Sequence, residues 1–240
     1  MEIIISGYGR MGKEVEKICY NRNHNIVAIL DSVKDWEKLD AKNNSAAIII
    51  DFSLPEEAIN NYLKCFKLGL PIVTGTTGWY DKFDFITEQC AINNGTLFYA
   101  PNFSIGVNLF FKVNEYLAKL MTGFNNYKAH INETHHIHKL DAPSGTAIAV
   151  ADGILKHNSS YDNWSLNKKD NLDSLPVFSH RKGEVTGNHE VVYESNEDIL
   201  SIVHQAKNRS GFALGAVLAA EFVAGKHGIF NMDDFLNHTL

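Results

Sequence analysis

The chain has 240 residues, of which 45% are hydrophobic and 21% charged, so it can bury one large or two small cores and is neither fibrous nor disordered. A net charge of −6 gives no general attraction to nucleic acid or anionic lipid, and any anionic ligand therefore needs a local site. The three cysteines are widely separated, and no apolar run has the length of a membrane span. Because the sequence starts in a strand-like segment, we expect no signal peptide. We expect free thiols and a cytoplasmic protein.

The first third of the chain alternates short β-rich runs with helical patterns. A helix is expected from Met11, because Met11, Val15, Ile18 and Cys19 share one helical face. A second is expected after Ser53, with Ser53 as its cap, Pro55 in its first turn and Glu56 completing a capping box. This alternation predicts a parallel sheet with helical crossovers. The expected strands are 2–6, 25–30, 46–52, 70–74 and 96–100.

The pattern changes after Asn102. An amphipathic helix is expected over 109–121, a strand over 128–133 and a helix over 144–155. Residues 157–176 are rich in Asn, Asp, Ser and Lys and predict a surface loop, and 185–193 and 199–206 predict two antiparallel strands. The last expected helix, 211–225, has small residues on one side. The fold class is therefore α/β, with a parallel-sheet layer followed by a mixed α+β domain.

A glycine-rich loop joins the first strand to the first helix. It reads Gly7-Tyr8-Gly9-Arg10-Met11-Gly12 and matches G-x-G-x-x-G, in which the glycines permit a tight turn, the approach of a pyrophosphate and close packing of helix on strand. Asp31, at the end of the second strand, has the spacing of a ribose-binding carboxylate. It favours NADH, although Arg10 and Lys34 can reach a 2′-phosphate, so the cofactor is NADH or NADPH. The alternative is a purely structural turn.

The segment from Glu133 to Thr146 holds three histidines, a lysine and a Gly-Thr helix start within fourteen residues. Alternation along a strand end puts His136 and His138 on one face and His135 on the other, so a zinc site needs a distant ligand and we expect no metal. A structural cluster is a second alternative. The catalytic interpretation explains more, because His and Lys donate protons near neutral pH and attract carboxylates. Ser144-Gly145-Thr146 at a helix N-terminus offers donors to a second carboxylate.

The sequence resembles the dihydrodipicolinate reductases. Their signature, E-x-H-H-x-x-K-x-D-A-P-S-G-T, fits 133–146 at each defined position. Two departures from the family pattern concern adenosine recognition: the glycine loop is one residue shorter than the common form, and the stretch from Asp31 to Ala46 is much shorter. Other matches follow the family's order along the chain, namely Gly9-Arg10-Met11-Gly12, Asp51-Phe52-Ser53-Leu54-Pro55-Glu56, Gly75-Thr76-Thr77-Gly78, 100–108, Gly187-Asn188-His189-Glu190 and 211–216.

The resemblance implies NAD(P)H-dependent reduction of 4-hydroxy-tetrahydrodipicolinate, a small cyclic dicarboxylate, to tetrahydrodipicolinate in lysine and diaminopimelate biosynthesis. It also implies a Rossmann-type domain over 1–106 and 209–240, to which the C-terminal helix returns, a substrate and oligomerisation domain over 107–208, and a homotetramer formed through the second domain's sheet. His135 and Lys139 resemble the catalytic acid/base pair; His136 and Lys139 resemble contacts to one carboxylate, and Gly145 and Thr146 the site of the other. The residues that resemble cofactor contacts are Gly7, Tyr8, Gly9, Arg10, Met11, Gly12, Asp31, Gly75, Thr76, Thr77, Ala100, Pro101, Asn102 and Phe103, with Arg209 and Phe212 near the nicotinamide.

The sequence is also compatible with two alternative functions. One is a different Rossmann oxidoreductase, such as an amino-acid or semialdehyde dehydrogenase, which predicts turnover of another carbonyl substrate. The other is a non-catalytic NAD(H)-sensing module, which has no need of the His/Lys/Gly-Thr segment.

Overall fold

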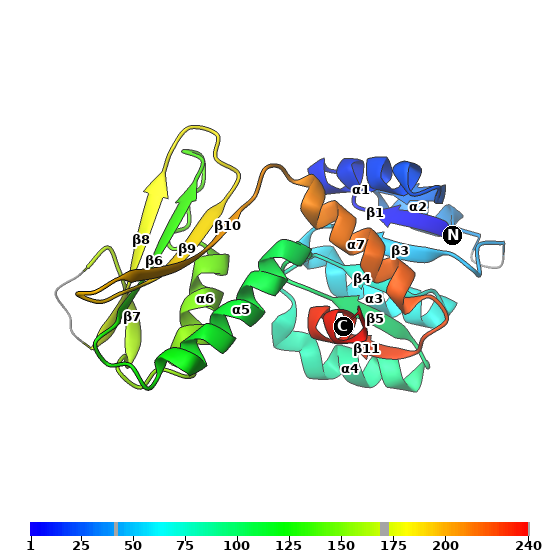
Figure 1. Ribbon diagram of the computed structural model, residues 1–240. Coiled ribbons are helices and arrows are strands. Elements are labelled where there is room, and N and C mark those ends of the chain that lie inside the picture. Colours follow the sequence, from blue (N-terminus) through cyan, green and yellow to red (C-terminus); the bar gives the residue numbers. More distant parts are fainter. Residues whose placement is uncertain (41–42, 169–172, 240) are drawn as a thin grey trace. The chain divides into compact units, whose positions relative to one another are not determined.

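The computed structural model describes residues 1–40, 43–168 and 173–239, which form two compact units (Figure 1). Unit 1 comprises Met1–Ile105 and Arg209–Leu240, and unit 2 comprises Gly106–Asn208. The polypeptide thus leaves unit 1 once, forms unit 2 and returns.

Unit 1 contains a parallel sheet with helices on both faces. The strand order is β11-β5-β4-β3-β1-β2, and each neighbouring pair is parallel. This confirms the predicted α/β Rossmann-type class and the return of the C-terminal segment to the first sheet. In chain order the elements are β1 (Glu2–Ser6), α1 (Arg10–Asn21), β2 (Asn25–Leu30), α2 (Val33–Lys38), β3 (Ile48–Asp51), α3 (Pro55–Leu68), β4 (Ile72–Thr74), η1 (Tyr80–Lys82), α4 (Phe83–Ile92), β5 (Thr96–Tyr99), α7 (Ser210–Val223), β11 (Gly228–Phe230) and α8 (Met232–Thr239).

The strands of unit 1 are apolar on both sides because each face of the sheet is covered. Ile3 and Ile5 of β1 pack on one face with α1 and α7, whereas Ile4 packs on the other face with α3 and α4. Runs of buried isoleucine, such as Ile48–Ile50 in β3, are typical of strands buried on both faces of a parallel sheet.

The start of α3 differs from the prediction at one residue. Pro55 occupies the first turn as expected, but the cap position is Leu54, which has no side-chain acceptor. Ser53 lies one residue too early to cap, and its hydroxyl instead accepts a hydrogen bond from Asn61 Nδ2 at 3.2 Å. The predicted capping box with Glu56 is therefore wrong.

Unit 2 is a mixed sheet covered by helices on one face. The strand order is β10-β9-β6-β8-β7; β6 is parallel to β8 and antiparallel to β9, and β9 and β10 are antiparallel as predicted. In chain order the elements are α5 (Ile105–Met121), β6 (Lys128–His135), α6 (Gly145–Leu155), β7 (Asn163–Leu166), β8 (Ser174–Arg181), β9 (Asn188–Glu194) and β10 (Ile199–Gln205).

Strict alternation along β6 determines which of its residues face the helices. Ala129 and Ile131 are buried in one core with residues of α5 and α6, and Glu133 and His135 continue the same buried face toward the end of the strand. Figure 1 shows α5 and α6 beside this sheet. On the edge strand β10, Ile199 and Val203 are exposed on the opposite face. One face of this sheet therefore builds a core, and the other presents apolar side chains to the surface.

The polar stretch 157–176 is not a loop throughout. It contains β7 and the start of β8, while 169–172 lie outside the described residues. Its polarity is compatible with a strand because β7 is an edge strand whose Asn163 is exposed. Among the helices of the described residues, none has the length and hydrophobicity needed to span a membrane.

Candidate active site

Two of the three loop glycines are required by their surroundings. Gly7 has a φ of +81°, its N–H donates to the carbonyl of Leu30 at 2.9 Å, and a Cβ there would lie 2.4 Å from the carbonyl oxygen of Phe52. A Cβ on Gly12 would lie 2.3 Å from the carbonyl oxygen of Gly7. At Gly9, by contrast, an added Cβ meets no atom of the described residues within 4 Å. The loop is thus packed tightly at its ends and faces open space at its centre.

Asp31 is tied to this loop. Its Oδ1 accepts a hydrogen bond from the Tyr8 amide at 2.7 Å, and its own amide donates to Asp35 Oδ2 at 3.1 Å. The Asp31 side chain is exposed. Asp31 therefore fixes the loop and still presents a carboxylate beside it, at the carboxyl end of β2.

Three adjoining cavities lie along the carboxyl ends of the strands in unit 1. They have volumes of about 500, 330 and 290 Å³, and all three are lined by Phe52. Together they bring every predicted cofactor residue except Gly12 to one edge of the sheet, where parallel α/β folds bind their ligands. Gly7, Tyr8, Gly9 and Asp31 line the largest; Gly9, Arg10, Met11, Gly75, Thr76 and Thr77 line the second; Met11, Gly75, Ala100, Pro101, Asn102 and Phe103 line the third with Arg209 and Phe212.

A buried carboxylate supports the middle of this edge. Asp51, fully buried at the end of β3, accepts hydrogen bonds from the hydroxyls of Ser6 at 2.7 Å, Thr74 at 3.0 Å and Thr76 at 2.9 Å. Three strands and the Gly75–Thr77 loop are thereby held at fixed positions. The motif containing Asp51 was visible in the sequence, but this role was not.

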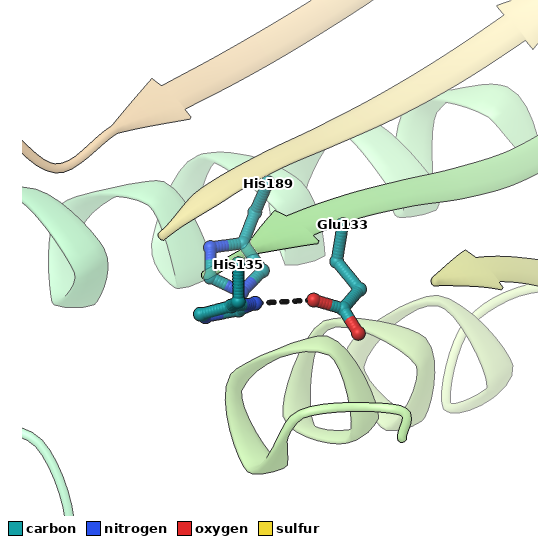
Figure 2. Close-up of side chains that lie close together, drawn as sticks. All are labelled: Glu133, His135 and His189. Atoms are coloured by element: carbon teal, nitrogen blue, oxygen red, sulfur yellow. Dashed lines mark hydrogen bonds and ion pairs between the residues drawn. The ribbon is translucent and has the colours of Figure 1, made fainter. Parts of the chain in front are cut away.

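In unit 2, a buried carboxylate and two histidines meet (Figure 2). Glu133 Oε2 accepts a short hydrogen bond from Nδ1 of His135, which is 8% exposed, and the His135 and His189 ring centroids are 5.2 Å apart. The pairing fixes the tautomer of His135 so that its Nε2 is the nitrogen available for proton transfer. Burial by itself raises the pKa of Glu133, but hydrogen bonds from His135 and Arg181 outweigh it and lower the pKa to about 2. Glu133 is therefore a carboxylate at neutral pH.

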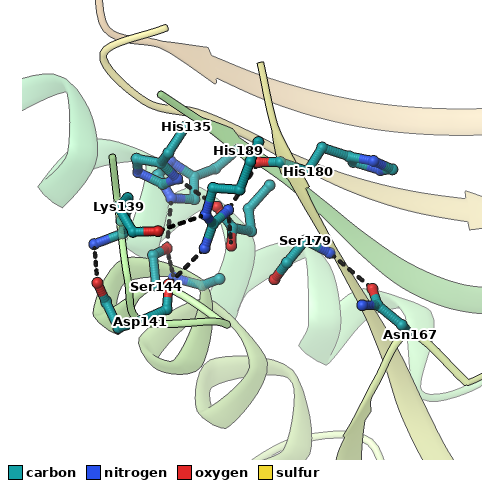
Figure 3. A network of polar contacts seen from close by, with 11 residues as sticks. His135, Lys139, Asp141, Ser144, Asn167, Ser179, His180 and His189 are labelled. Carbon is teal, nitrogen blue, oxygen red and sulfur yellow. Dashed lines mark hydrogen bonds and ion pairs between the residues drawn. The ribbon is translucent and has the colours of Figure 1, made fainter. Parts of the chain in front are cut away.

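Lys139 lies in the turn that follows β6 (Figure 3). Its Nζ forms an ion pair with Asp141 Oδ1 at 2.8 Å, and the hydrogen bond from Lys139 lowers the pKa of Asp141. The backbone carbonyls of Lys139 and Asp141 accept hydrogen bonds from the Arg181 guanidinium, which also donates to Glu133 Oε1 at 3.0 Å. Lys139 and His135 are thus connected through one arginine.

The predicted anion site stands at the start of α6. Ser144 caps this helix as expected, since its hydroxyl accepts the Ala147 amide at 3.2 Å, and Gly145 and Thr146 form the first turn. His189 Nε2 lies 3.1 Å from the Ser144 hydroxyl, which places the histidine pair directly beside the helix N-terminus.

His136 and His138 lie beyond the strand, so the predicted alternation does not extend to them. Their ring centroids are 6.0 Å apart, and His138 Nε2 lies 3.3 Å from Glu184 Oε1 at the surface. His136 is half-buried, and its Nδ1 has no hydrogen-bond partner within the described ranges.

The described residues contain one group with metal-ligand spacing, and it is not the sequential histidine trio. Ligand atoms of Glu133, His135 and His189 lie within 4.8 Å of one another. However, both oxygens of Glu133 are already hydrogen-bonded, to His135 and Arg181. The absence of a metal requirement therefore stays a prediction.

Glu133, Arg181 and His189 received no role from sequence reasoning. Arg181 was missed because strand β8 was not recognised beyond the polar stretch before it. Leu175, Val177, Ser179 and Arg181 recur at every second position and share the inward face, a signal that was present in the sequence.

Comparisons with known proteins agree with this geometry. Residues 1–103 match the model for the N-terminus of dihydrodipicolinate reductase, and 106–236 match the model for its C-terminus. A 4-hydroxy-tetrahydrodipicolinate reductase of Christiangramia forsetii is 46% identical over 99% of this chain and 98% of its own length, and one from Archaeoglobus fulgidus is 33% identical over 98% of this chain and 100% of its own. A dipicolinate-bound dihydrodipicolinate reductase from Paenisporosarcina sp. TG-14 has the same fold, with a TM-score of 0.77 at 23% identity over 96% of this chain and 97% of its own. The chain therefore belongs to the dihydrodipicolinate reductase family.

Proposed function

We propose that this chain reduces 4-hydroxy-tetrahydrodipicolinate to tetrahydrodipicolinate with NADH or NADPH, in lysine and diaminopimelate biosynthesis. The observation that carries the proposal is the grouping of His135, its carboxylate partner and Lys139 at the N-terminus of α6, in a chain of this family. A cationic, proton-donating group beside a helix N-terminus suits a substrate with two carboxylates and a reacting imine.

Reductases of this family use NADH or NADPH, and unit 1 has a cradle that fits such a cofactor. The open space above Gly9 leaves room for a pyrophosphate against the N-terminus of α1. The first turn of this helix carries no acidic residue that would repel it. We propose that the cavity beside Asp31 takes the adenosine, the cavity at Gly75–Thr77 the phosphates, and the one formed by Ala100–Phe103, Arg209 and Phe212 the nicotinamide. The reduced nicotinamide supplies the hydride.

The proposed roles in unit 2 follow from charge and hydrogen bonding. His135 and Lys139 hold and move the proton, since the Nδ1 of His135 is engaged by Glu133 and its Nε2 is left for substrate. His136 and Lys139 bind one carboxylate, and the amides of Gly145 and Thr146 with the Ser144 cap bind the other. The histidine and lysine side chains of this group also stabilise the charge that develops as hydride reaches the ring. The dipicolinate bound to the Paenisporosarcina protein is a ring of this kind.

The decisive experiment is steady-state kinetics of three alanine variants with freshly prepared substrate. Lys139→Ala should lower kcat and raise KM, because the lysine donates a proton and binds a carboxylate, whereas His135→Ala should act on kcat, by about 10²–10⁴-fold. His136→Ala should act on KM. Circular dichroism and NADH affinity serve as controls for folding. Near wild-type kcat in both Lys139→Ala and His135→Ala, with normal cofactor binding, would refute the assignment and favour a nucleotide-binding module.

We further propose a homotetramer and a cytoplasmic location. The uncovered face of the second sheet supports the assembly, because Ile199 and Val203 are exposed there, and the buried free thiols Cys19, Cys65 and Cys90 suit a reducing compartment. Light scattering tests the assembly directly. Val203→Lys should dissociate it, and a mass of one chain for the wild type would contradict the proposal.

A further inference from the structure

We propose that Arg181 is a positioning residue that holds both proton-handling groups, His135 and Lys139, in their working geometry. This inference rests on the proposed function for the roles of those two groups. Arg181 itself touches neither of the side chains that are proposed to meet the substrate. It acts through the carboxylate that orients one of them and through the backbone that carries the other.

The placement of Arg181 follows from the strand register. It ends β8 and pairs with His135 of the parallel strand β6, and Ser179 pairs with Glu133 in the same ladder. Alternation then directs Arg181, Glu133 and His135 to one face of the sheet. The Arg181 side chain is 21% exposed, and that of Glu133 is fully buried. An ion pair in such a setting is weakly screened by water.

The guanidinium of Arg181 donates hydrogen bonds both to β6 and β8 and to the turn that carries Lys139. Nη1 donates to Glu133 Oε1 at 3.0 Å and to the carbonyl of His180 at 2.8 Å. Nε donates to the carbonyl of Lys139 at 3.2 Å, and Nη2 makes a short hydrogen bond to the carbonyl of Asp141. The planar guanidinium thus serves a carboxylate and three carbonyls at once, one acceptor more than the three N–H donors of an ammonium group can each bind.

The loop that carries Lys139 has few other attachments. Leu140 in this loop is 97% exposed, and the side chain of Asp141 is 58% exposed. Backbone hydrogen bonds link Ile137 to Gly183 and Lys139 to His136. Two of the contacts that fix 139–141 therefore belong to Arg181. Without them the backbone that carries Lys139 loses two of its attachments to the end of β8.

A purely structural ion pair is the alternative explanation. Such a pair would satisfy Glu133 alone and would affect stability without a selective effect on the reaction. The observed donors instead join the strand that carries His135 to the turn that carries Lys139. A displacement of about 1 Å at a reacting group costs on the order of 10²-fold in rate, so loss of this connection should appear in kcat.

The test compares Arg181→Ala and Arg181→Lys with Arg22→Ala. Arg22 is a matched control, since it forms a bidentate pair with Glu221 at 2.7 and 2.8 Å in unit 1, away from the proposed chemistry. We expect both Arg181 variants to lose on the order of 10²-fold in kcat, to raise KM for the dicarboxylate and to keep the wild-type affinity for NADH. Arg22→Ala should leave kcat and both KM values unchanged.

Chemical rescue separates positioning from folding. Millimolar ethylguanidinium should restore part of the kcat of Arg181→Ala but none of that of Lys139→Ala. If Arg181→Ala does not fold, Arg181→Lys decides, because a lysine keeps the charge without the fork. Wild-type kcat and KM in Arg181→Lys, or a loss of kcat in Arg181→Ala that ethylguanidinium leaves unchanged, would overturn the inference.

A second readout does not depend on turnover. In protein labelled with ¹⁵N-histidine, the His135 ring should show a single Nδ1–H tautomer that is lost or averaged in Arg181→Ala and retained in Arg22→Ala. If the wild type reduces no dicarboxylate, the proposed function fails, and this measurement still decides whether Arg181 holds His135. An unchanged ring spectrum in Arg181→Ala would contradict the inference by itself.

Discussion

Lowering the pH should destabilise unit 2 through one buried histidine. His189 is 4% exposed, and burial, together with the neighbouring His135, lowers its pKa to about 3. Its Nδ1 has no hydrogen-bond partner among the residues that the structure describes, and its Nε2 meets the Ser144 hydroxyl. The folded protein therefore holds this ring neutral at pH values where an unfolded chain would protonate it.

The size of the stability loss follows from the difference in the pKa of His189 between the folded and the unfolded protein. An unfolded histidine has a pKa of about 6.5, and each pH unit below that value costs the folded state about 1.4 kcal/mol for as long as the folded ring stays neutral. This cost is absent above about pH 6.5, where the ring is neutral in both states, and it grows progressively as the pH falls to the folded pKa of about 3. At about pH 5 the loss should be about 2 kcal/mol.

The assay is urea unfolding followed by circular dichroism at about pH 7.5 and about pH 5, for the wild type and His189→Gln. Glutamine keeps an amide near Ser144 and does not titrate. The variant should be less stable at the higher pH but should lose about 2 kcal/mol less than the wild type on acidification. His180→Gln is the matched control, since His180 is exposed on β8 of the same sheet. An equal pH dependence in the wild type and His189→Gln would refute the reasoning.

Two further predictions concern the cofactor loop and metals. Gly9→Ala should fold with nearly wild-type stability, because its Cβ meets no described atom within 4 Å, and should bind NADH more weakly in a calorimetric titration; Gly9→Val should weaken binding further. Gly12→Ala should instead lose about 1–3 kcal/mol in urea unfolding, because its Cβ would lie 2.3 Å from the Gly7 carbonyl oxygen. Equal NADH affinity in the wild type and Gly9→Val would contradict the proposed pyrophosphate site at Gly9. Dialysis against a strong chelator should leave activity intact, and recovery of lost activity with Zn²⁺ would reassign Glu133, His135 and His189 as ligands.

Helices and strands could be predicted from the sequence where burial imposes a regular spacing of apolar residues. The isoleucine run of β1, the alternation in β6 and the apolar helix α7 each have a pattern that burial on one or two faces requires. β7 was missed because an edge strand can carry polar residues on its exposed side. The helix cap at Ser53 was wrong because Pro55 set the first turn one residue later than the capping box required.

In unit 2, only those site residues that lie near one another in the sequence were predicted. His135, His136, Lys139, Gly145 and Thr146 fall within one segment, so a local pattern was enough to select them. The partners of that segment come from elsewhere: Arg181 from β8 and His189 from β9. Which strands neighbour β6 depends on the pairing of the sheet, and a single sequence does not specify that pairing.

The order of strands in unit 1 has a consequence for how the chain acquires its structure during synthesis. β5 pairs with β4 on one side and with β11 on the other, and Thr96 is aligned with Gly228. While a ribosome makes the intervening residues, β5 is an unprotected sheet edge, and the apolar face later covered by α7 is open to solvent. Unit 2 is continuous in sequence and can complete its sheet during that interval. A nascent chain that stalls before residue 228 would therefore present a template for aggregation beside an already folded insert.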